Sequence, residues 1–205
     1  TSSSSSKSSS EIVLPFKNDM PDLILRALCK KQGIDMADLS LSYTATPPEA
    51  LALFLQKKVD LALLPEPLVS VAIMRGKLSG QAIGRVFDIQ HAWEQASQTQ
   101  SGIPQAGLLV SEAFYQENDA FIQQLQTDLE QALFWTHAHP HEAADIGAKL
   151  IPAPAIAIEA SLPHANLVVE STRQHQEDIM TFFKALYEMN PKIIGGKLPD
   201  SSLFA

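Results

Sequence analysis

The sequence predicts an α/β fold with a parallel sheet, because the pattern of a strand, a turn and a helix occurs twice in the first third of the chain. In each copy a short apolar run leads into a polar turn, and the turn opens a helix. The two runs cover residues 12–16 and 41–43, and a third, nearly continuous apolar run covers residues 59–64. The turns that follow parallel strands lie along one edge of the sheet, and open α/β sheets bind ligands at that edge.

The first helix is predicted from a D-x-x-D start at Asp19 and Asp22 to a stop at Gly33. Acidic residues at the cap and in the first turn accept free N–H groups and oppose the positive end of the helix dipole. The apolar face of this helix should be buried, with Arg26 among the residues that face water. Cys29, the single cysteine of the chain, is expected to be a small buried side chain.

The second helix is predicted to run from a T-x-x-E capping box at Thr46 and Glu49 to Lys58. The strand over residues 59–64 should be covered on both faces, because it is nearly all apolar. A helix over residues 68–75, ended by Gly76, is expected next.

The remainder of the chain is predicted to alternate short strands with helices. Residues 86–89, 105–110 and 167–169 are the expected strands, and residues 91–101 are expected to form a loop or a short surface helix. The longest helix should begin at Asn118 or Asp119 and end before Pro140. Further helices are expected over residues 141–150, from Pro152 and Pro154 through 160, and over 177–189, followed by an irregular tail.

Composition excludes several classes of protein. The 205 residues carry a formal net charge of −8 and no basic block, so nucleic acid is not expected to be a partner. No apolar run approaches the ~20 residues of a membrane span. No signal-peptide pattern is found, so a mature soluble protein is expected. The serine-rich residues 1–10 are expected to form a flexible leader.

Five motifs, in this order, resemble one known family. They are LPFKNDMPD at 14–22, YTATPPEA at 43–50, VDLALLPEP at 59–67, GIPQAGL at 102–108 and GGKLPD at 195–200. The set is similar to the substrate-binding proteins of ABC importers in the nitrate, sulfonate, taurine and thiamine-precursor group. The resemblance implies a type II periplasmic-binding-protein fold of two α/β lobes, with a small-molecule solute in the cleft. It also implies export to a periplasmic or extracytoplasmic location and delivery to an ABC permease at the membrane.

The sequence departs from that family before residue 12, where family members carry several strands and helices. The resemblance therefore implies that residues 11–85 form the complete second lobe. Residues 86–205 would form the crossover and the C-terminal part of a first lobe that is incomplete here. With half of the cleft missing, this chain alone is expected to bind solute weakly or not at all.

Six residues are the candidate ligand-binding residues: Lys17, Asn18, Asp19, Thr44, Glu66 and Gln105. The first three lie at a helix N-terminus, where free N–H groups suit a polar or anionic solute. An ordinary cap with a solvated lysine is the alternative for them.

Each of the other three candidates also has a structural alternative. Thr46 is expected to be committed to capping, which leaves Thr44 as the better ligand contact. Glu66 faces the cleft or the hinge, or pairs with a lysine, and Gln105 begins a strand or is a surface amide. Trp93 and Tyr43 can stack on a ring, although packing is the favoured role for both.

No metal site, cofactor or catalytic residue is predicted. The histidines at 137, 139 and 141 straddle a helix end and a proline, so they do not share one face as zinc ligands would. No nucleophile elbow, Walker loop or dinucleotide fingerprint is found. The favoured function is the solute-binding component of an ABC importer for a small polar or anionic organic solute. The alternatives are an enzyme of the menaquinone-pathway or thiamine-precursor type on the same fold, and a sensor or scaffold fragment that binds no solute.

Overall fold

A computed structural model describes residues 10–204 of the chain. The leader predicted at residues 1–10 lies outside this range except for Ser10. The chain forms two compact units, which divide between Ile89 and Gln90. The lobes predicted at 11–85 and 86–205 stay a prediction.

The first unit contains a parallel sheet, as the sequence predicts. Its strands are β1 (Glu11–Pro15), β2 (Ser40–Thr44) and β3 (Leu61–Ala62), in the order β2-β1-β3. Ile12 of the central strand lies opposite Leu41 on one side and Leu61 on the other. The predicted third strand is shortened to two residues. It lies at an edge, where Leu61 is 37% exposed.

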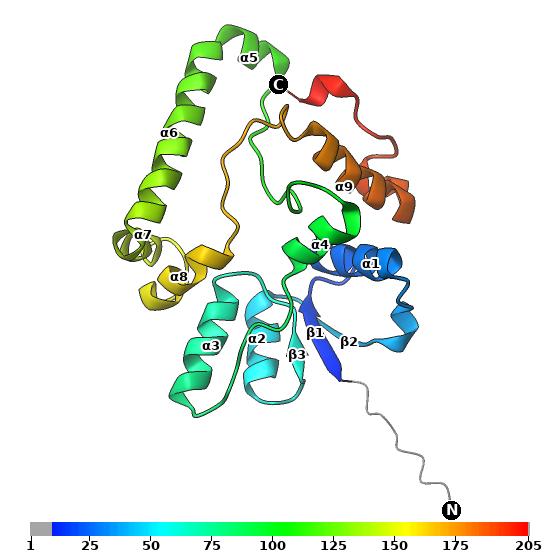
Figure 1. The fold of residues 1–205 in the computed structure, drawn as a ribbon, viewed down its shortest axis with the longest axis vertical. Helices are drawn as coiled ribbons and strands as arrows, with labels where there is room; N and C mark the ends of the chain where they lie inside the picture. The colour runs from blue at the N-terminus through cyan, green and yellow to red at the C-terminus, as the bar shows by residue number, and fades with distance from the viewer. Residues whose placement is uncertain (1–9, 205) are drawn as a thin grey trace, which may run out of the picture. The chain divides into compact units, whose positions relative to one another are not determined.

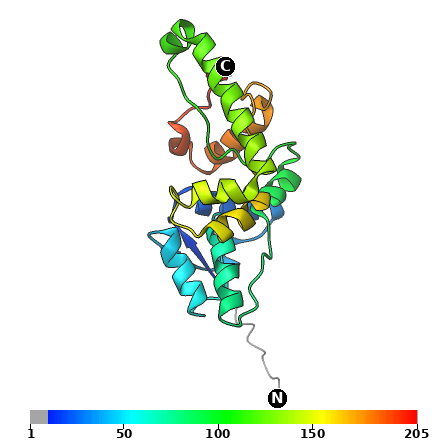
Figure 2. The same ribbon diagram turned by 90° about the vertical axis from the view of Figure 1, so that its left-hand side faces the viewer.

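Two α-helices, α1 and α2, pack on this sheet, and a third, α3, packs on α2 (Figures 1 and 2). They are α1 (Met20–Gln32), α2 (Pro47–Leu55) and α3 (Leu68–Leu78), with a short 3₁₀ helix η1 (Met36–Asp38) after α1. α1 ends at Gly33, whose φ of 68° supplies the left-handed C-cap that favours glycine. α2 ends three residues before the predicted Lys58, because the chain turns at Lys57 with a φ of 58°.

Gly76 does not end α3 as predicted, and the helix continues to Leu78. Gly76 is buried there, and a Cβ at this position would lie 2.8 Å from Cδ1 of Ile83. The glycine therefore permits a close approach of the returning chain.

The core of the first unit lies between the sheet and its helices. Val13, Ala50 and Val59 form one buried cluster, and Leu14 of the central strand is fully buried. Cys29 is buried as predicted, and burial raises the pKa of its thiol.

The second unit is helical over its described residues. Its α-helices are α4 (Ile89–Ser97), α5 (Glu112–Glu117), α6 (Asp119–Ala138), α7 (Pro140–Gly147), α8 (Ala155–Ser161) and α9 (Gln176–Met189). Short 3₁₀ helices follow as η2 (Leu162–His164), η3 (Pro191–Ile194) and η4 (Ser201–Leu203). The predicted long helix, its break before Pro140 and the amphipathic C-terminal helix are confirmed. α5 was not predicted.

The three strands predicted beyond residue 85 are wrong. Residues 86–88, 105–110 and 167–169 have no regular secondary structure, and Ile89 begins α4. Their apolar side chains are exposed, as for Val86 (84%), Leu109 (83%) and Val168 (68%). An apolar run becomes a strand only where another strand pairs with it, and these runs have no such partner among residues 10–204.

Trp93 is the centre of the packing around α4 and α9. It is fully buried, and its ring meets Phe182 edge to face with ring centroids 5.4 Å apart. Asp178 near the start of α9 accepts hydrogen bonds from the backbone of Gln100 and Ser101. The helix predicted as a possible surface element is thus held in the core by its tryptophan.

Candidate functional site

The candidate site in the first unit is the carboxyl edge of its parallel sheet. Turns follow β1 at residues 16–19, β2 at 45–46 and β3 at 63–66. Because the strands are parallel, these turns emerge at the same edge. The structure therefore brings the turn that carries Lys17 and Asn18 to the edge where Thr44 ends β2 and Glu66 follows β3.

The turn after β1 exposes three polar side chains at the N-terminus of α1, those of Lys17, Asn18 and Asp19. Asp19 is the N-cap, and its Oδ1 accepts a hydrogen bond of 2.7 Å from the backbone N–H of Met20. The ammonium of Lys17 lies 5.4 Å from the centre of the Tyr43 ring, within the range of a cation–π contact.

The conformation of this turn is unusual for its residues. Phe16 and Asn18 have φ angles of 61° and 63°, in the left-handed region that residues other than glycine rarely occupy. The backbone N–H of Phe16 donates to the carbonyl of Thr44, at 2.9 Å, which ties the turn to the end of β2.

A buried carboxylate underlies the turn. Asp22 is fully buried, and its Oδ2 accepts a hydrogen bond of 2.9 Å from the backbone N–H of Asn18. Its Oδ1 accepts from Nε of Arg26 and from the hydroxyl of Tyr43, both at 2.9 Å. Arg26 faces water in part, since 37% of its side chain is exposed, and its guanidinium also pairs with Asp22, which was not predicted.

The charges of this cluster stabilise one another. The hydrogen bond to Asp22 raises the pKa of Arg26. Burial, together with the bond to Asp22, raises the pKa of Tyr43, so its hydroxyl keeps its proton. Sequence reasoning missed this cluster, although the spacing of Asp22 and Arg26 was a signal, because residues four apart are neighbours on a helix.

The turn after β2 is closed differently from the prediction. Thr46 occupies the N-cap of α2, but its side chain makes no capping bond, so the predicted capping role of its hydroxyl is wrong. Thr44 instead donates its hydroxyl to the carbonyl of Thr46, at 2.9 Å, and Glu49 accepts from the backbone N–H of Ala45, at 3.1 Å. The Thr44 hydroxyl keeps its acceptor lone pairs for other contacts.

Glu66 is engaged with a cation of its own unit. Its carboxylate pairs with the guanidinium of Arg85 and accepts a 3.1 Å bond from the backbone N–H of Ser70. Arg85 also donates to the hydroxyl of Ser70, at 2.8 Å. Pairing with a lysine is one alternative that the sequence allows for Glu66. In the structure Glu66 does pair with a basic residue, but that residue is Arg85.

Gln105 belongs to the second unit, where it is exposed in a segment without regular structure. Its membership of a solute site stays a prediction. Trp93, considered for ring stacking, is a core residue, and Tyr43 belongs to the Asp22 cluster.

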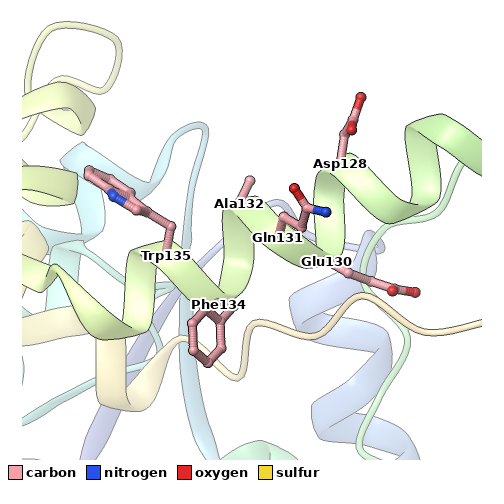
Figure 3. A pocket seen from close by; sticks show the side chains of 6 residues that line it. All are labelled: Asp128, Glu130, Gln131, Ala132, Phe134 and Trp135. Carbon is pink, nitrogen blue, oxygen red and sulfur yellow. The ribbon is translucent and has the colours of Figure 1, made fainter.

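The second unit carries a depression of about 700 Å³ on α6. Figure 3 shows that its lining side chains all come from that helix; they are Asp128, Glu130, Gln131, Ala132, Phe134 and Trp135. Because one helix supplies every wall, the depression does not enclose a small molecule.

Two histidines of the predicted run make surface contacts. His139 stacks on Trp135, with ring centroids 5.0 Å apart, and His141 bonds Glu159 at 3.0 Å. Among residues 10–204 no three His, Cys, Asp or Glu side chains gather as metal ligands would.

Comparison with known proteins supports the fold. No family model and no curated protein matches the sequence. Among solved structures, the chain is similar to an ABC transporter protein from Parabacteroides distasonis, with 20% identity and a TM-score of 0.75, over 96% of this chain and 66% of that one. It is also similar to the periplasmic aliphatic sulphonate-binding protein SsuA from Escherichia coli, with 16% identity and a TM-score of 0.63, over 96% of this chain and 62% of that one.

These structures define the class of fold. The chain has the type II periplasmic-binding-protein fold with one lobe incomplete, as predicted, and it spans less than two thirds of the length of the proteins it matches. Within the described residues, no helix combines the length and the apolar character needed to cross a membrane.

Proposed function

We propose that this protein is the solute-binding component of an ABC importer and that it works outside the cytoplasmic membrane. The solute would be a small polar or anionic organic molecule, and the bound form would be handed to a membrane permease. The fold shared with a periplasmic binding protein supports this function, as does the chemistry of the sheet edge. The proposed role is binding rather than catalysis.

The observation that carries the proposal is the exposed N-terminus of α1 beside the carboxyl edge of the sheet. The 13-residue helix directs the positive end of its dipole at the turn that carries Lys17 and Asn18. A lysine ammonium and an amide at such a position favour a carboxylate, sulfonate or similar group. The Asp19 carboxylate at the same turn suits a hydrogen-bond donor elsewhere on the solute.

The other candidate residues complete the proposal. Thr44 supplies a hydroxyl at the end of β2, and Glu66 supplies a largely buried carboxylate, paired with Arg85, after β3.

Titration calorimetry with the product of the complete reading frame tests the proposed solute class. Butanesulfonate is the anionic probe and butylammonium the matched cation. We expect the sulfonate to bind and Lys17→Ala or Asn18→Ala to weaken binding, because each removes a polar group from the turn. Lys58→Ala is the matched control, because this exposed lysine precedes β3 at the opposite edge of the sheet.

The proposal fails if variants at the five positions of the sheet edge all bind an identified solute as tightly as the unmodified protein; these are Lys17, Asn18, Asp19, Thr44 and Glu66. Its location is tested by cell fractionation. A full-length protein confined to the cytosol would contradict a role in import.

A further inference from the structure

We propose that Asp22 is the positioning residue of the candidate site, holding the Lys17–Asp19 turn in the shape that presents its polar groups to a solute. The inference rests on the proposed function, because it concerns the residues of that same edge. Asp22 itself is fully buried, so it acts through the turn and not by touching the solute.

The two carboxylate oxygens of Asp22 accept hydrogen bonds from different parts of the structure. Oδ2 accepts the backbone N–H of Asn18, at 2.9 Å, and so holds the turn. Oδ1 accepts Nε of Arg26 and the hydroxyl of Tyr43, and so fixes the carboxylate between α1 and β2. A buried carboxylate with three donors is strongly constrained, since losing any one of them leaves a desolvated polar group.

The turn needs such a constraint because of its backbone. Phe16 has a φ of 61°, which a bulky residue rarely adopts, and Asn18 has a φ of 63°, which asparagine tolerates better than most residues other than glycine. Strained backbone persists only where the surroundings over-determine it. Three bonds hold this turn: Asn18 N–H to the Asp22 carboxylate, Phe16 N–H to the Thr44 carbonyl, and Asp19 N–H to the Phe16 carbonyl at 3.0 Å. Without the first bond the turn can relax, and the side chains of Lys17 and Asn18 then lose their common orientation.

A turn that is already ordered binds its solute without paying the entropy of ordering. Asp22 therefore sets the affinity of a site that it does not enter. The other oxygen, Oδ1, holds Tyr43, and the ammonium of Lys17 lies 5.4 Å from the centre of that ring.

The test substitutes Asp22→Asn and follows amide hydrogen exchange in the chain without any solute. Asparagine has one acceptor oxygen, and we expect it to stay with the two side-chain donors, Arg26 and Tyr43. Its NH2 group then faces the Asn18 N–H, so that bond is lost. We expect the Asn18 amide to exchange about tenfold faster, while the Leu63 amide, which donates to the Val13 carbonyl of β1, stays unchanged. Asp60→Asn, which removes an exposed carboxylate, is the matched control and should change neither rate.

Tyr43→Phe separates the two oxygens. It removes one donor to Oδ1 and leaves the bond from Oδ2 to Asn18, so exchange at Asn18 should stay close to that of the unmodified chain. Equal acceleration in Tyr43→Phe and Asp22→Asn would overturn the assignment of the turn to Oδ2. Unchanged exchange at Asn18 in Asp22→Asn, or unfolding of the whole unit, would overturn the proposal itself.

Binding of butanesulfonate then distinguishes this inference from the proposed function. We expect Asp22→Asn to weaken binding in the full-length protein about tenfold, as loss of preorganisation does. If the unmodified protein binds no solute while exchange at Asn18 responds as expected, the proposed function fails and the positioning role stands. If the unmodified protein binds and Asp22→Asn binds equally well, Asp22 does not position the site.

Discussion

Residues of the same chemical type take different roles at the sheet edge, according to the donors near them. Asp19 and Asp22 both belong to the predicted start of α1, but Asp19 caps the helix in solvent whereas Asp22 is buried under the turn. Thr44 and Thr46 were correctly placed at the second turn, yet the hydroxyl that closes it is that of Thr44. The sequence predicts such positions well, but the atom that each side chain meets depends on the tertiary fold.

Replacing Thr46 with alanine should therefore have little effect on stability. A capping threonine would cost about 1 kcal/mol when lost. Because the Thr46 side chain makes no capping bond, we expect a change in the free energy of unfolding within about 0.5 kcal/mol, measured by urea titration.

Thr44→Val is the matched variant and should cost about 1 kcal/mol, since it removes the hydroxyl that bonds the Thr46 carbonyl. A larger loss for Thr46→Ala than for Thr44→Val would contradict this account of the turn.

His141 should titrate above the usual range of histidine. Its bond to Glu159, with the nearby Asp145 charge, raises its pKa. A raised pKa stabilises the folded state below the unfolded value of about pH 6.5, and this contribution is lost as the pH rises through the folded pKa.

An NMR titration of the His141 ring measures this directly. Glu159→Gln should lower the pKa toward its ordinary value, because it removes the charged acceptor on α8. A histidine that titrates identically in both proteins would refute the contact between α7 and α8.

At the scale of elements, local signals predict helices better than strands in this chain. α1, α6 and α9 follow from apolar periodicity and end signals carried within each segment. The apolar runs at 105–110 and 167–169 look equally clear, yet they remain unpaired. A strand needs a neighbour to complete its hydrogen bonds, and no local pattern states whether that neighbour exists.

Gly76→Ala should destabilise the first unit, although alanine is the better helix former. The added Cβ would lie 2.8 Å from Ile83 Cδ1 and 3.0 Å from the carbonyl oxygen of Gln81. We expect a loss of about 1–2 kcal/mol in urea unfolding, because overpacking outweighs the gain of about 1 kcal/mol in helix propensity.

Gly84→Ala is the control, because no atom lies within 4 Å of the Cβ it would add. It should be neutral or slightly stabilising. If Gly76→Ala is the more stable of the two variants, the close approach of Ile83 to α3 is not rigid.

For the whole molecule, the sequence predicts the first unit best, because the strands of that unit pair with one another. The repeated strand-turn-helix unit defines the parallel sheet, and its topology places the candidate edge before any side chain is considered. The second unit buries Trp93 and Phe182 but leaves Leu109 and Val168 exposed. Packing there is therefore concentrated in few residues, and apolar character alone does not identify them.

We therefore expect Trp93→Ala to destabilise the second unit strongly and Leu109→Ala to have little effect on its stability. Trp93 is fully buried against Phe182, so its loss should cost about 3–5 kcal/mol. Leu109 is 83% exposed, so its truncation should change the free energy of unfolding by less than about 0.5 kcal/mol. Far-UV circular dichroism during urea unfolding of residues 1–205 measures both variants. A large loss for Leu109→Ala would mean that residues 105–110 are packed in solution, in conflict with the exposure that the structure gives them.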